Sequence, residues 1–196
     1  MPNWCNNNLY ISHPDPKMME KAVEAWNSGK FLGTLVPEPD YKEVKVKPTF
    51  PTNMATGESK PEFVDPDQAW WDWRLQNWGT KWDFGLTSDY GHPAQLDKDG
   101  AMFIYFDSAW SPPTDAYEKL MDMGYFIRSY YYEGGCAFCG KWEDGVEDFY
   151  NIDPPEGVKT SVWVRENIPA DLDREMDIAD SYESFEEDEE DEDAEV

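Results

Sequence analysis

Three cysteines and two histidines are the residues of this chain best suited to bind a soft metal ion. Cys136 and Cys139 form a C-x-x-C pair, and Cys5 with either His13 or His92 would complete four zinc ligands. No second pair with ligand spacing exists in the sequence, and buried free thiols are common in globular proteins. We therefore expect no metal site and no cofactor, and keep Cys136 and Cys139 only as weak candidates.

Catalytic chemistry has few candidates in this sequence. His13 and His92 each precede a proline in loop-like sequence, without a serine or cysteine motif that would make a nucleophile. Carboxylates are so numerous that no two of them stand out as an acid–base pair. Asp83 and Asp107 lie beside aromatic motifs, where we expect them to cap turns or to accept backbone or indole N–H groups. Phosphate-binding glycine loops are absent, and we predict no catalytic residue.

Tryptophans dominate residues 65 to 83, "DPDQAWWDWRLQNWGTKWD", which hold five of the chain's ten tryptophans. The first residues of this stretch predict a helix start, and Gly79 is predicted to end the helix. Helical geometry places Trp71 and Trp78 on one side. We expect Trp71, Trp78 and Trp82 to lie in a core, because large rings with one polar edge pack well at the ends of elements.

The residues around these rings are predicted to form a structural seam. Its members are Trp4, Asn77, Trp78, Gly79, Lys81, Trp82, Asp83, Asp107 and Trp110. Trp73 points away from the predicted core and Trp70 lies between the two sides, so both need a second cover. The cover is either the insertion at 31–64 or a partner. The run Tyr130–Tyr132 is a further candidate for a partner interface, because aromatic side chains dominate interface hot spots.

Acidic side chains outnumber basic ones by 42 to 16, which gives a net charge of −26. This charge repels phosphate groups, so we expect neither direct nucleic-acid binding nor binding to an anionic membrane. The sequence contains no apolar run long enough to span a membrane and no signal-peptide pattern at its start. Together with the odd number of cysteines, these features favour a location in the cytoplasm.

Apolar patterns along the chain predict the order of its elements. The predicted order is a strand at 8–13, a helix at 15–30, an irregular insertion at 31–64, the tryptophan-rich helix, strands at 82–88 and 101–110, a helix at 111–124, and strands at 125–133, 136–145 and 146–152. Without the insertion this order is βαββαβ, the ferredoxin-like plan. The predicted fold class is therefore α+β, an antiparallel sheet with helices on one face.

The C-terminal part of the chain has a different composition. We assign residues 1–170 to the α+β domain, with an extended edge segment at 161–168, and residues 171–196 to an acidic tail. The last seventeen residues carry eleven carboxylates and no lysine or arginine. A weak helix is predicted at 169–181, and disorder is predicted from about residue 181.

Four separate motifs resemble one known family, the YubB-type ferredoxin-like proteins of bacteriophages and conjugative plasmids. They are "MPNWCNNNLYI" at the start (Pro2, Asn3, Trp4, Cys5, Asn6, Asn7), "FLGTLVPEP" (Phe31 to Pro39), "NWGTKWD" (Asn77 to Asp83) and "FDSAWSPP" (Phe106 to Pro113). The resemblance spans roughly residues 1 to 150 and does not extend to the acidic end. It implies a ferredoxin-like fold and an accessory role in a mobile element, and it implies no catalytic residue.

The leading functional hypothesis is a non-catalytic accessory protein of a phage or plasmid that binds a host protein with a basic surface. A dense acidic surface can imitate the phosphates of DNA, so nucleic-acid-binding or defence proteins are the expected targets of inhibition. The predicted contact residues are Trp70, Trp73, Tyr130, Tyr131, Tyr132, Glu186, Glu187, Asp188 and Glu189.

Two alternatives predict different structures. A small-ligand binder or enzyme in the tryptophan-rich seam, using Asp83, Asp107 or His92, predicts a concave pocket and a titratable group with a shifted pKa there. An oligomeric structural module predicts a large apolar interface that buries Trp73 and the tyrosines. The DNA-mimic hypothesis predicts a continuous acidic face without such a pocket.

Overall fold

A computed structural model describes residues 2–43, 45–48, 56, 66–87 and 91–194, and of residues 66–67 and 189–194 it describes only the helical backbone. The strands are β1 (Trp4–Ser12), β2 (Met102–Ala109), β3 (Phe126–Glu133), β4 (Phe138–Glu143) and β5 (Val146–Asn151). The helices are α1 (Pro16–Asn27), α2 (Phe31–Leu35), α3 (Pro66–Asn77), α4 (Thr114–Asp122), α5 (Thr160–Asn167), α6 (Ala170–Met176) and α7 (Ile178–Ala194). Together they make an α+β fold.

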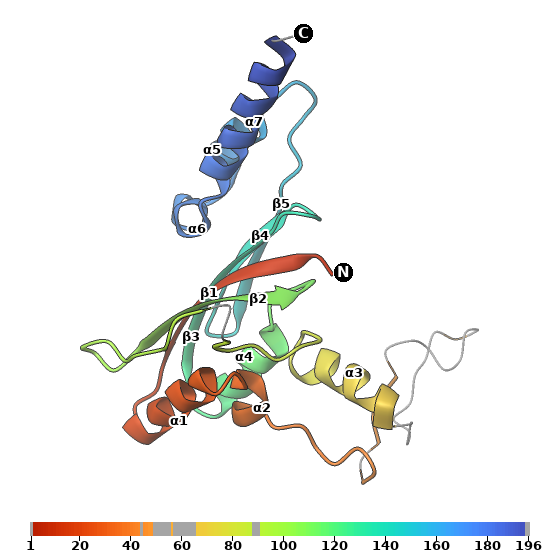
Figure 1. Cartoon of the computed structure of the whole chain (residues 1–196), viewed down its shortest axis with the longest axis vertical. Coiled ribbons are helices and arrows are strands. Elements are labelled where there is room, and N and C mark those ends of the chain that lie inside the picture. The colour runs from red at the N-terminus through yellow and green to blue at the C-terminus, as the bar shows by residue number, and fades with distance from the viewer. Residues whose placement is uncertain (1, 44, 49–55, 57–65, 88–90, 195–196) are drawn as a thin grey trace.

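The strands form one antiparallel sheet in the order β2-β1-β3-β4-β5 (Figure 1). β1 pairs with β2 on one side and with β3 on the other. α4 connects β2 to β3, so these two strands run in the same direction with β1 between them. β4 and β5 follow as hairpins, and Asp144 and Gly145 adopt positive φ angles of 46° and 85°, as a tight two-residue hairpin turn requires. The predicted antiparallel sheet is therefore confirmed.

The predicted βαββαβ order is wrong at its second strand. Residues 82–87 form no strand in the part of the chain that is described. Their backbone groups bond instead to the helices beside them: the Leu86 N–H donates to the Trp26 carbonyl at 2.9 Å, and the Phe84 carbonyl accepts the Phe31 N–H at 2.9 Å. Because those groups are occupied by helix ends, this segment adds no strand to the sheet, which is extended by β4 and β5 at its other edge.

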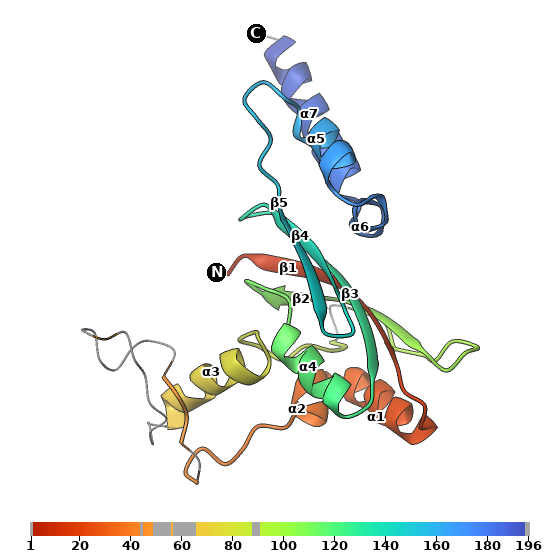
Figure 2. The same ribbon diagram turned by 180° about the vertical axis from the view of Figure 1, so that it is seen from behind.

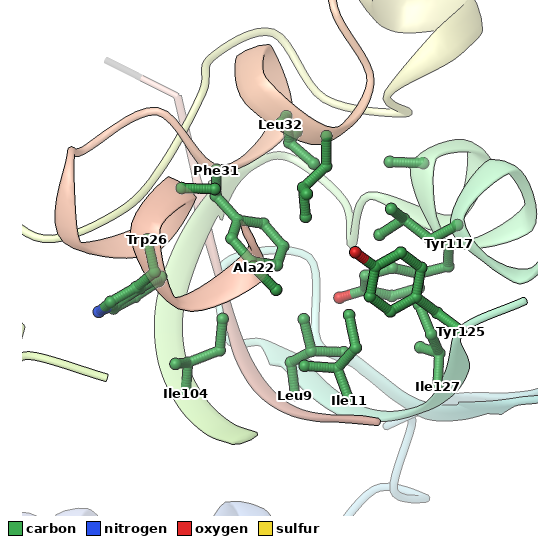
Figure 3. Packing of buried hydrophobic residues seen from close by; sticks show 14 of the residues in the cluster. Leu9, Ile11, Ala22, Trp26, Phe31, Leu32, Ile104, Tyr117, Tyr125 and Ile127 are labelled. Carbon is green, nitrogen blue, oxygen red and sulfur yellow. The ribbon is translucent and has the colours of Figure 1, made fainter. Parts of the chain in front are cut away.

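The first core lies between the sheet and α1, α2 and α4 (Figure 3). Leu9 and Ile11 point into it from β1, because alternate residues of a strand face the same side. On α1 the buried residues include Met19, Ala22 and Trp26. The predicted first helix is confirmed, with the Asp15 carboxylate accepting the Lys17 N–H and Pro16 at the first helical position.

A second, smaller core covers part of the opposite face of the sheet. It joins β3 and β4 to α5, α6 and α7, and its buried members are Tyr130, Cys139, Ile152, Val164, Ile168, Leu172, Ile178 and Ala179. Figures 1 and 2 show α1 to α4 on one side of the sheet and α5 to α7 on the other. The prediction of helices on one face only is therefore wrong, and the second core crosses the boundary expected at residue 170.

The C-terminal segment also differs from its prediction. Residues 161–168, expected to be extended, belong almost entirely to α5, and α7 runs to Ala194 where disorder was expected from about residue 181. The Arg165 guanidinium contacts Asp180 at 2.7 Å and Glu183 at 2.6 Å, which pairs the two helices. A prediction from local composition cannot include ion pairs between residues that are far apart in the sequence.

Replacement of Ile178 by alanine tests whether the second core contributes to the stability of the whole chain. Ile178 is fully buried, so we expect Ile178→Ala to lower the free energy of unfolding by about 2–5 kcal/mol. Urea denaturation followed by circular dichroism measures this loss. Val162→Ala, at a position on α5 that is 44% exposed, is the control and should change it by about 0.5 kcal/mol or less. Equal effects of the two variants would contradict the assigned core.

Candidate functional site

Three stretches far apart in sequence meet at one end of the sheet. The start of β1 lies beside the end of β2, with Trp4 opposite Ala109, and the segment after α3 lies against them (Figures 1 and 2). A pocket of about 360 Å³ opens between these stretches, and its lining includes Trp4, Trp82 and Asp107. We call it the tryptophan pocket. It is a concave site of the kind that the ligand-binding alternative predicts.

The two tryptophans that line this pocket, Trp4 and Trp82, are exposed, and so is Trp110 beside it. Trp4, Trp82 and Trp110 have relative exposures of 47%, 36% and 43%. The centroids of the Trp4 and Trp82 rings are 5.7 Å apart with 36° between their planes, so they form one bent aromatic surface. The Lys81 ammonium lies 4.6 Å from the Trp82 ring centroid and 5.6 Å from that of Trp110. Both distances are typical of cation–π contacts.

Trp82 is therefore not a core residue, whereas Trp78 is. Trp78 is fully buried, and its indole N–H donates to the Val36 carbonyl at 2.9 Å. After α3, Gly79 adopts a φ of 77°, which turns the chain away from the helix axis. Trp82 follows this turn and reaches the surface at the sheet end. The prediction that Trp82 packs in a core is thus corrected.

Asp107 supplies a carboxylate to the pocket. It lies opposite Asn6 in the β1–β2 ladder, and the Asn6 amide donates to its Oδ1 at 2.6 Å. Within the described residues, its Oδ2 accepts no hydrogen bond and no lysine or arginine forms an ion pair with it. The asparagine thus orients the carboxylate and leaves one oxygen free to accept a donor from a ligand.

Asp83 lines the same pocket but is occupied by the fold. Its carboxylate accepts the backbone N–H groups of Leu32, Gly33 and Phe84 at 2.7, 2.9 and 2.9 Å. Burial raises the pKa of Asp83 above its ordinary value, although the three N–H donors act in the opposite direction. A Cβ at Gly33 would lie 2.8 Å from Asp83 Oδ2, so only glycine fits there. Asp83 therefore positions α2 against the pocket wall.

The pocket floor and its oriented carboxylate depend on Gly85 and Asn6, to which the sequence assigned no role at a site. A Cβ at Gly85 would lie 2.7 Å from the Gly29 Cα, so two backbone segments can touch at the floor only because glycine stands at residue 85. Asn6 begins a run of three asparagines in β1, and asparagine is depleted in strands. That unusual run was a signal that these side chains have polar partners.

Trp70 and Trp73 are covered from within the chain. The Arg74 guanidinium lies over the Trp70 ring, 5.1 Å from its centroid, and forms two hydrogen bonds of 2.7 and 2.9 Å with Glu38. Tyr41 packs edge-on against Trp73 at 6.4 Å. The start of the expected insertion thus supplies Tyr41 against Trp73 and Glu38 against Arg74, whereas the cation on the Trp70 ring comes from α3 itself. Trp73, expected to point away from the core, also packs edge-on against Trp78 of the first core, with 5.8 Å between the ring centroids. Residues 49–55 and 57–64 of that insertion lie outside the described residues.

The tyrosine run does not form an exposed surface. Tyr131 is fully buried and Tyr130 is 7% exposed. The Tyr130 hydroxyl donates to Asp171 of α6 at 3.3 Å, and the Tyr132 ring packs edge-on against Tyr182 of α7. At Tyr130 and Tyr132 the C-terminal helices therefore occupy the place that a partner was expected to fill, for the interface hypothesis and for the oligomer hypothesis alike. Tyr131 instead donates to Glu147 of β5 at 2.7 Å and packs edge-on against Phe138 of β4.

The acidic candidates of the C-terminal helix divide into two groups. Glu186 accepts the Ser161 N–H at 3.1 Å and the Ser161 hydroxyl at 2.6 Å, so it is engaged at the start of α5. Glu187 and Asp188 are exposed. The Glu189 side chain lies outside the described residues. An anion at a helix N-terminus is favourable, so Glu186 has an internal role.

Neither histidine reaches the tryptophan pocket. His13 Nδ1 accepts the Asp15 N–H at 2.9 Å, which leaves Nε2 to donate to the Met123 carbonyl at 3.2 Å. His92 lines a different pocket, beside Trp26 and Tyr105. The fold therefore does not bring His92 together with Asp83 and Asp107, as an enzyme site in the seam that used His92 would require.

The three cysteines differ in their exposure to solvent. Cys5 and Cys139 are buried, while Cys136 is exposed. Burial raises the pKa of Cys139 to about 12 and also raises that of Cys5, which keeps both as neutral thiols. Among the described residues, no three His, Cys, Asp or Glu side chains are arranged to hold a metal ion.

Comparisons with protein-family models, with curated proteins and with solved structures found no match. No helix within the described ranges is both long and apolar enough to cross a membrane. The site must therefore be interpreted from its own geometry.

The two pocket carboxylates should differ in their effect on stability. Asp83→Ala leaves three backbone N–H groups without their acceptor, so we expect it to lower the free energy of unfolding by about 3 kcal/mol. Asp107→Ala removes one exposed hydrogen bond and should cost about 1 kcal/mol or less. Urea denaturation of the two variants measures the difference. Equal losses would show that Asp107 is as structural as Asp83.

Thiol reactivity should distinguish the three cysteines. At pH 8 we expect Ellman's reagent to modify Cys136 rapidly, whereas Cys5 and Cys139 react only as the chain unfolds, because both are buried and neutral. Absorbance at the usual wavelength follows the reaction, and urea should release the two slow thiols. Cys136→Ser is the matched variant and should remove the rapid phase. Two rapid thiols in the native protein would contradict the structure.

Proposed function

We propose that this chain is a non-catalytic binding protein that captures a basic side chain of a partner protein in the tryptophan pocket. The observation that carries the proposal is the free oxygen of Asp107 beside the exposed rings of Trp4 and Trp82. A guanidinium group can donate to a carboxylate and stack on an aromatic ring at the same time. Trp4 is the ring assigned to this stacking, because the Lys81 ammonium already lies 4.6 Å from the Trp82 ring centroid. Arginine is therefore the side chain that this arrangement fits best.

The electrostatics of the whole chain support the same kind of partner. A net charge of −26 attracts a basic surface over several ångströms and accelerates its encounter with the pocket. Long-range attraction alone does not choose between basic partners, so short-range selection requires a defined pocket. The proposal assigns attraction to the acidic surface and selection to the tryptophan pocket.

The geometry favours binding over catalysis. The enzyme alternative requires a titratable group with a shifted pKa that is free to act, and Asp83, whose pKa is raised, is held by three backbone donors. DNA mimicry centred on the C-terminal helix gains less support, because Glu186 is bound to Ser161. We place the contact at the pocket instead.

The wider biological setting is part of the proposal. The four motifs that resemble the YubB-type family imply an accessory protein of a phage or plasmid, acting in the bacterial cytoplasm on a host protein with a basic surface. Such a host protein would present the arginine that enters the pocket. Modulation or inhibition of that protein would follow from blocking its basic surface.

Short peptides with a single basic residue test the proposal. We expect the capped pentapeptide Gly-Gly-Arg-Gly-Gly to bind, and the same peptide with citrulline, which keeps the shape and removes the charge, to bind about tenfold more weakly or not at all. Isothermal titration calorimetry and tryptophan fluorescence measure the affinity. Asp107→Asn should weaken arginine binding about tenfold, and Trp4→Ala about fivefold.

Asp148→Asn is the matched control for Asp107→Asn. It makes the same change in net charge at an exposed position of β5, on the opposite edge of the sheet from β2. Its affinity for the arginine peptide should equal that of the unmodified chain. If Asp148→Asn and Asp107→Asn weaken binding equally, attraction is nonspecific and the proposal is wrong.

A further inference from the structure

Trp110 has a backbone conformation that does not suit its side chain. Its φ angle is 67°, in the left-handed region that glycine and asparagine tolerate and that large rings rarely occupy. The Trp110 N–H donates to the Asn3 carbonyl at 3.0 Å, which holds this turn at the end of β2. The turn therefore needs the backbone of residue 110 in this conformation, and a smaller residue would adopt it with less strain.

The Trp110 ring contributes to neither core of the described chain. It is 43% exposed and belongs to neither buried cluster. Among the described residues it stacks on no other aromatic ring, and its one cation–π contact is with the Lys81 ammonium, 5.6 Å from the ring centroid. A strained backbone that carries a half-exposed ring outside both cores is typical of residues kept for function.

Trp110 also lies directly beside the tryptophan pocket. It follows Ala109, a lining residue of that pocket. The Lys81 ammonium contacts the rings of both Trp82 and Trp110, so a cation connects the pocket wall to the outer ring. Among the described residues no carboxylate lies within ion-pair distance of this ammonium, although the chain has 42 acidic residues. The ammonium can therefore donate to an oxygen of a ligand.

We infer that Trp110 and Lys81 form a second subsite, which binds the peptide chain next to the arginine held in the tryptophan pocket. A peptide group is planar, so it can stack on the Trp110 ring, and its carbonyl oxygen can accept a hydrogen bond from the Lys81 ammonium. The inference rests on the proposed function and extends it: the partner is recognised as an arginine within a peptide segment, and not as an isolated cationic group.

Two ligands distinguish binding at the tryptophan pocket from binding at the second subsite. The capped pentapeptide Gly-Gly-Arg-Gly-Gly carries the guanidinium and its peptide groups, whereas butylguanidinium carries the same cationic end and no peptide group. We expect Trp110→Asn to weaken the pentapeptide about fivefold and to leave butylguanidinium unchanged within about twofold. Trp110→Phe retains a ring and should keep most of the pentapeptide affinity. Asp107→Asn should weaken both ligands.

Thermal unfolding tests whether Trp110→Asn weakens peptide binding only because it destabilises the fold. Asparagine tolerates the left-handed region, so the midpoint of Trp110→Asn should stay within about 3 °C of the unmodified chain. A larger fall would show that the ring supports the fold, and the inference would be overturned. Equal weakening of both ligands by Trp110→Asn, or no weakening of either, would overturn it too. If the unmodified chain binds neither ligand, the proposed function itself fails, and the subsite with it.

Discussion

The antiparallel register between β1 and β2 is the constraint on which both the core and the candidate site depend. The ladder places Leu9 opposite Ile104 and Asn6 opposite Asp107, so the same set of backbone bonds aligns the apolar face and orients the pocket carboxylate. A slip of one residue would turn Leu9 away from the core and separate Asn6 from Asp107. Because β1 is an inner strand, paired on both sides, such a slip would also break its ladder with β3.

A second constraint comes from Asp83, which joins the segment after α3 to the start of α2. Three backbone donors converge on one carboxylate there, and glycine at residue 33 makes room for it. Since Trp82 precedes Asp83 directly, the bonds that fix Asp83 also limit where the Trp82 ring can lie. The structural carboxylate and the exposed ring are thus adjacent in sequence but have different surroundings. This difference explains how a half-buried acid supports the pocket wall while its oxygens are occupied by backbone donors.

Aromatic residues serve two purposes in this molecule. Trp26 and Trp78 fill the first core, and each indole N–H donates to a backbone carbonyl. Trp4, Trp82 and Trp110 remain exposed at the sheet end. The C-terminal helices cover Tyr130 and Tyr132 of β3. Among the described residues, the exposed tryptophans lie at or beside the pocket. In the proposed function, charge attracts a basic partner and the exposed rings at the pocket select it.

From the sequence alone, the α+β class, the antiparallel sheet, the helix at Pro16–Asn27 and the burial of Trp78 could be predicted, because these follow from local periodicity and capping. Residues 82–87 could not be placed: their apolar composition suits a strand, but their backbone groups are taken by α1 and α2. Likewise, local composition gave no sign that Arg165 would pair with two carboxylates of the acidic helix.

The candidate site, too, could be predicted from the sequence only in part. The sequence named Trp4, Trp82, Asp83, Asp107 and Trp110 as one group, but it could not separate exposed rings from buried ones or a free carboxylate from an occupied one. Only the tertiary structure decided this, because exposure and hydrogen-bond partners depend on segments distant in the chain. Asn6 and Asp107 are 101 residues apart, and their contact exists only after β1 and β2 pair.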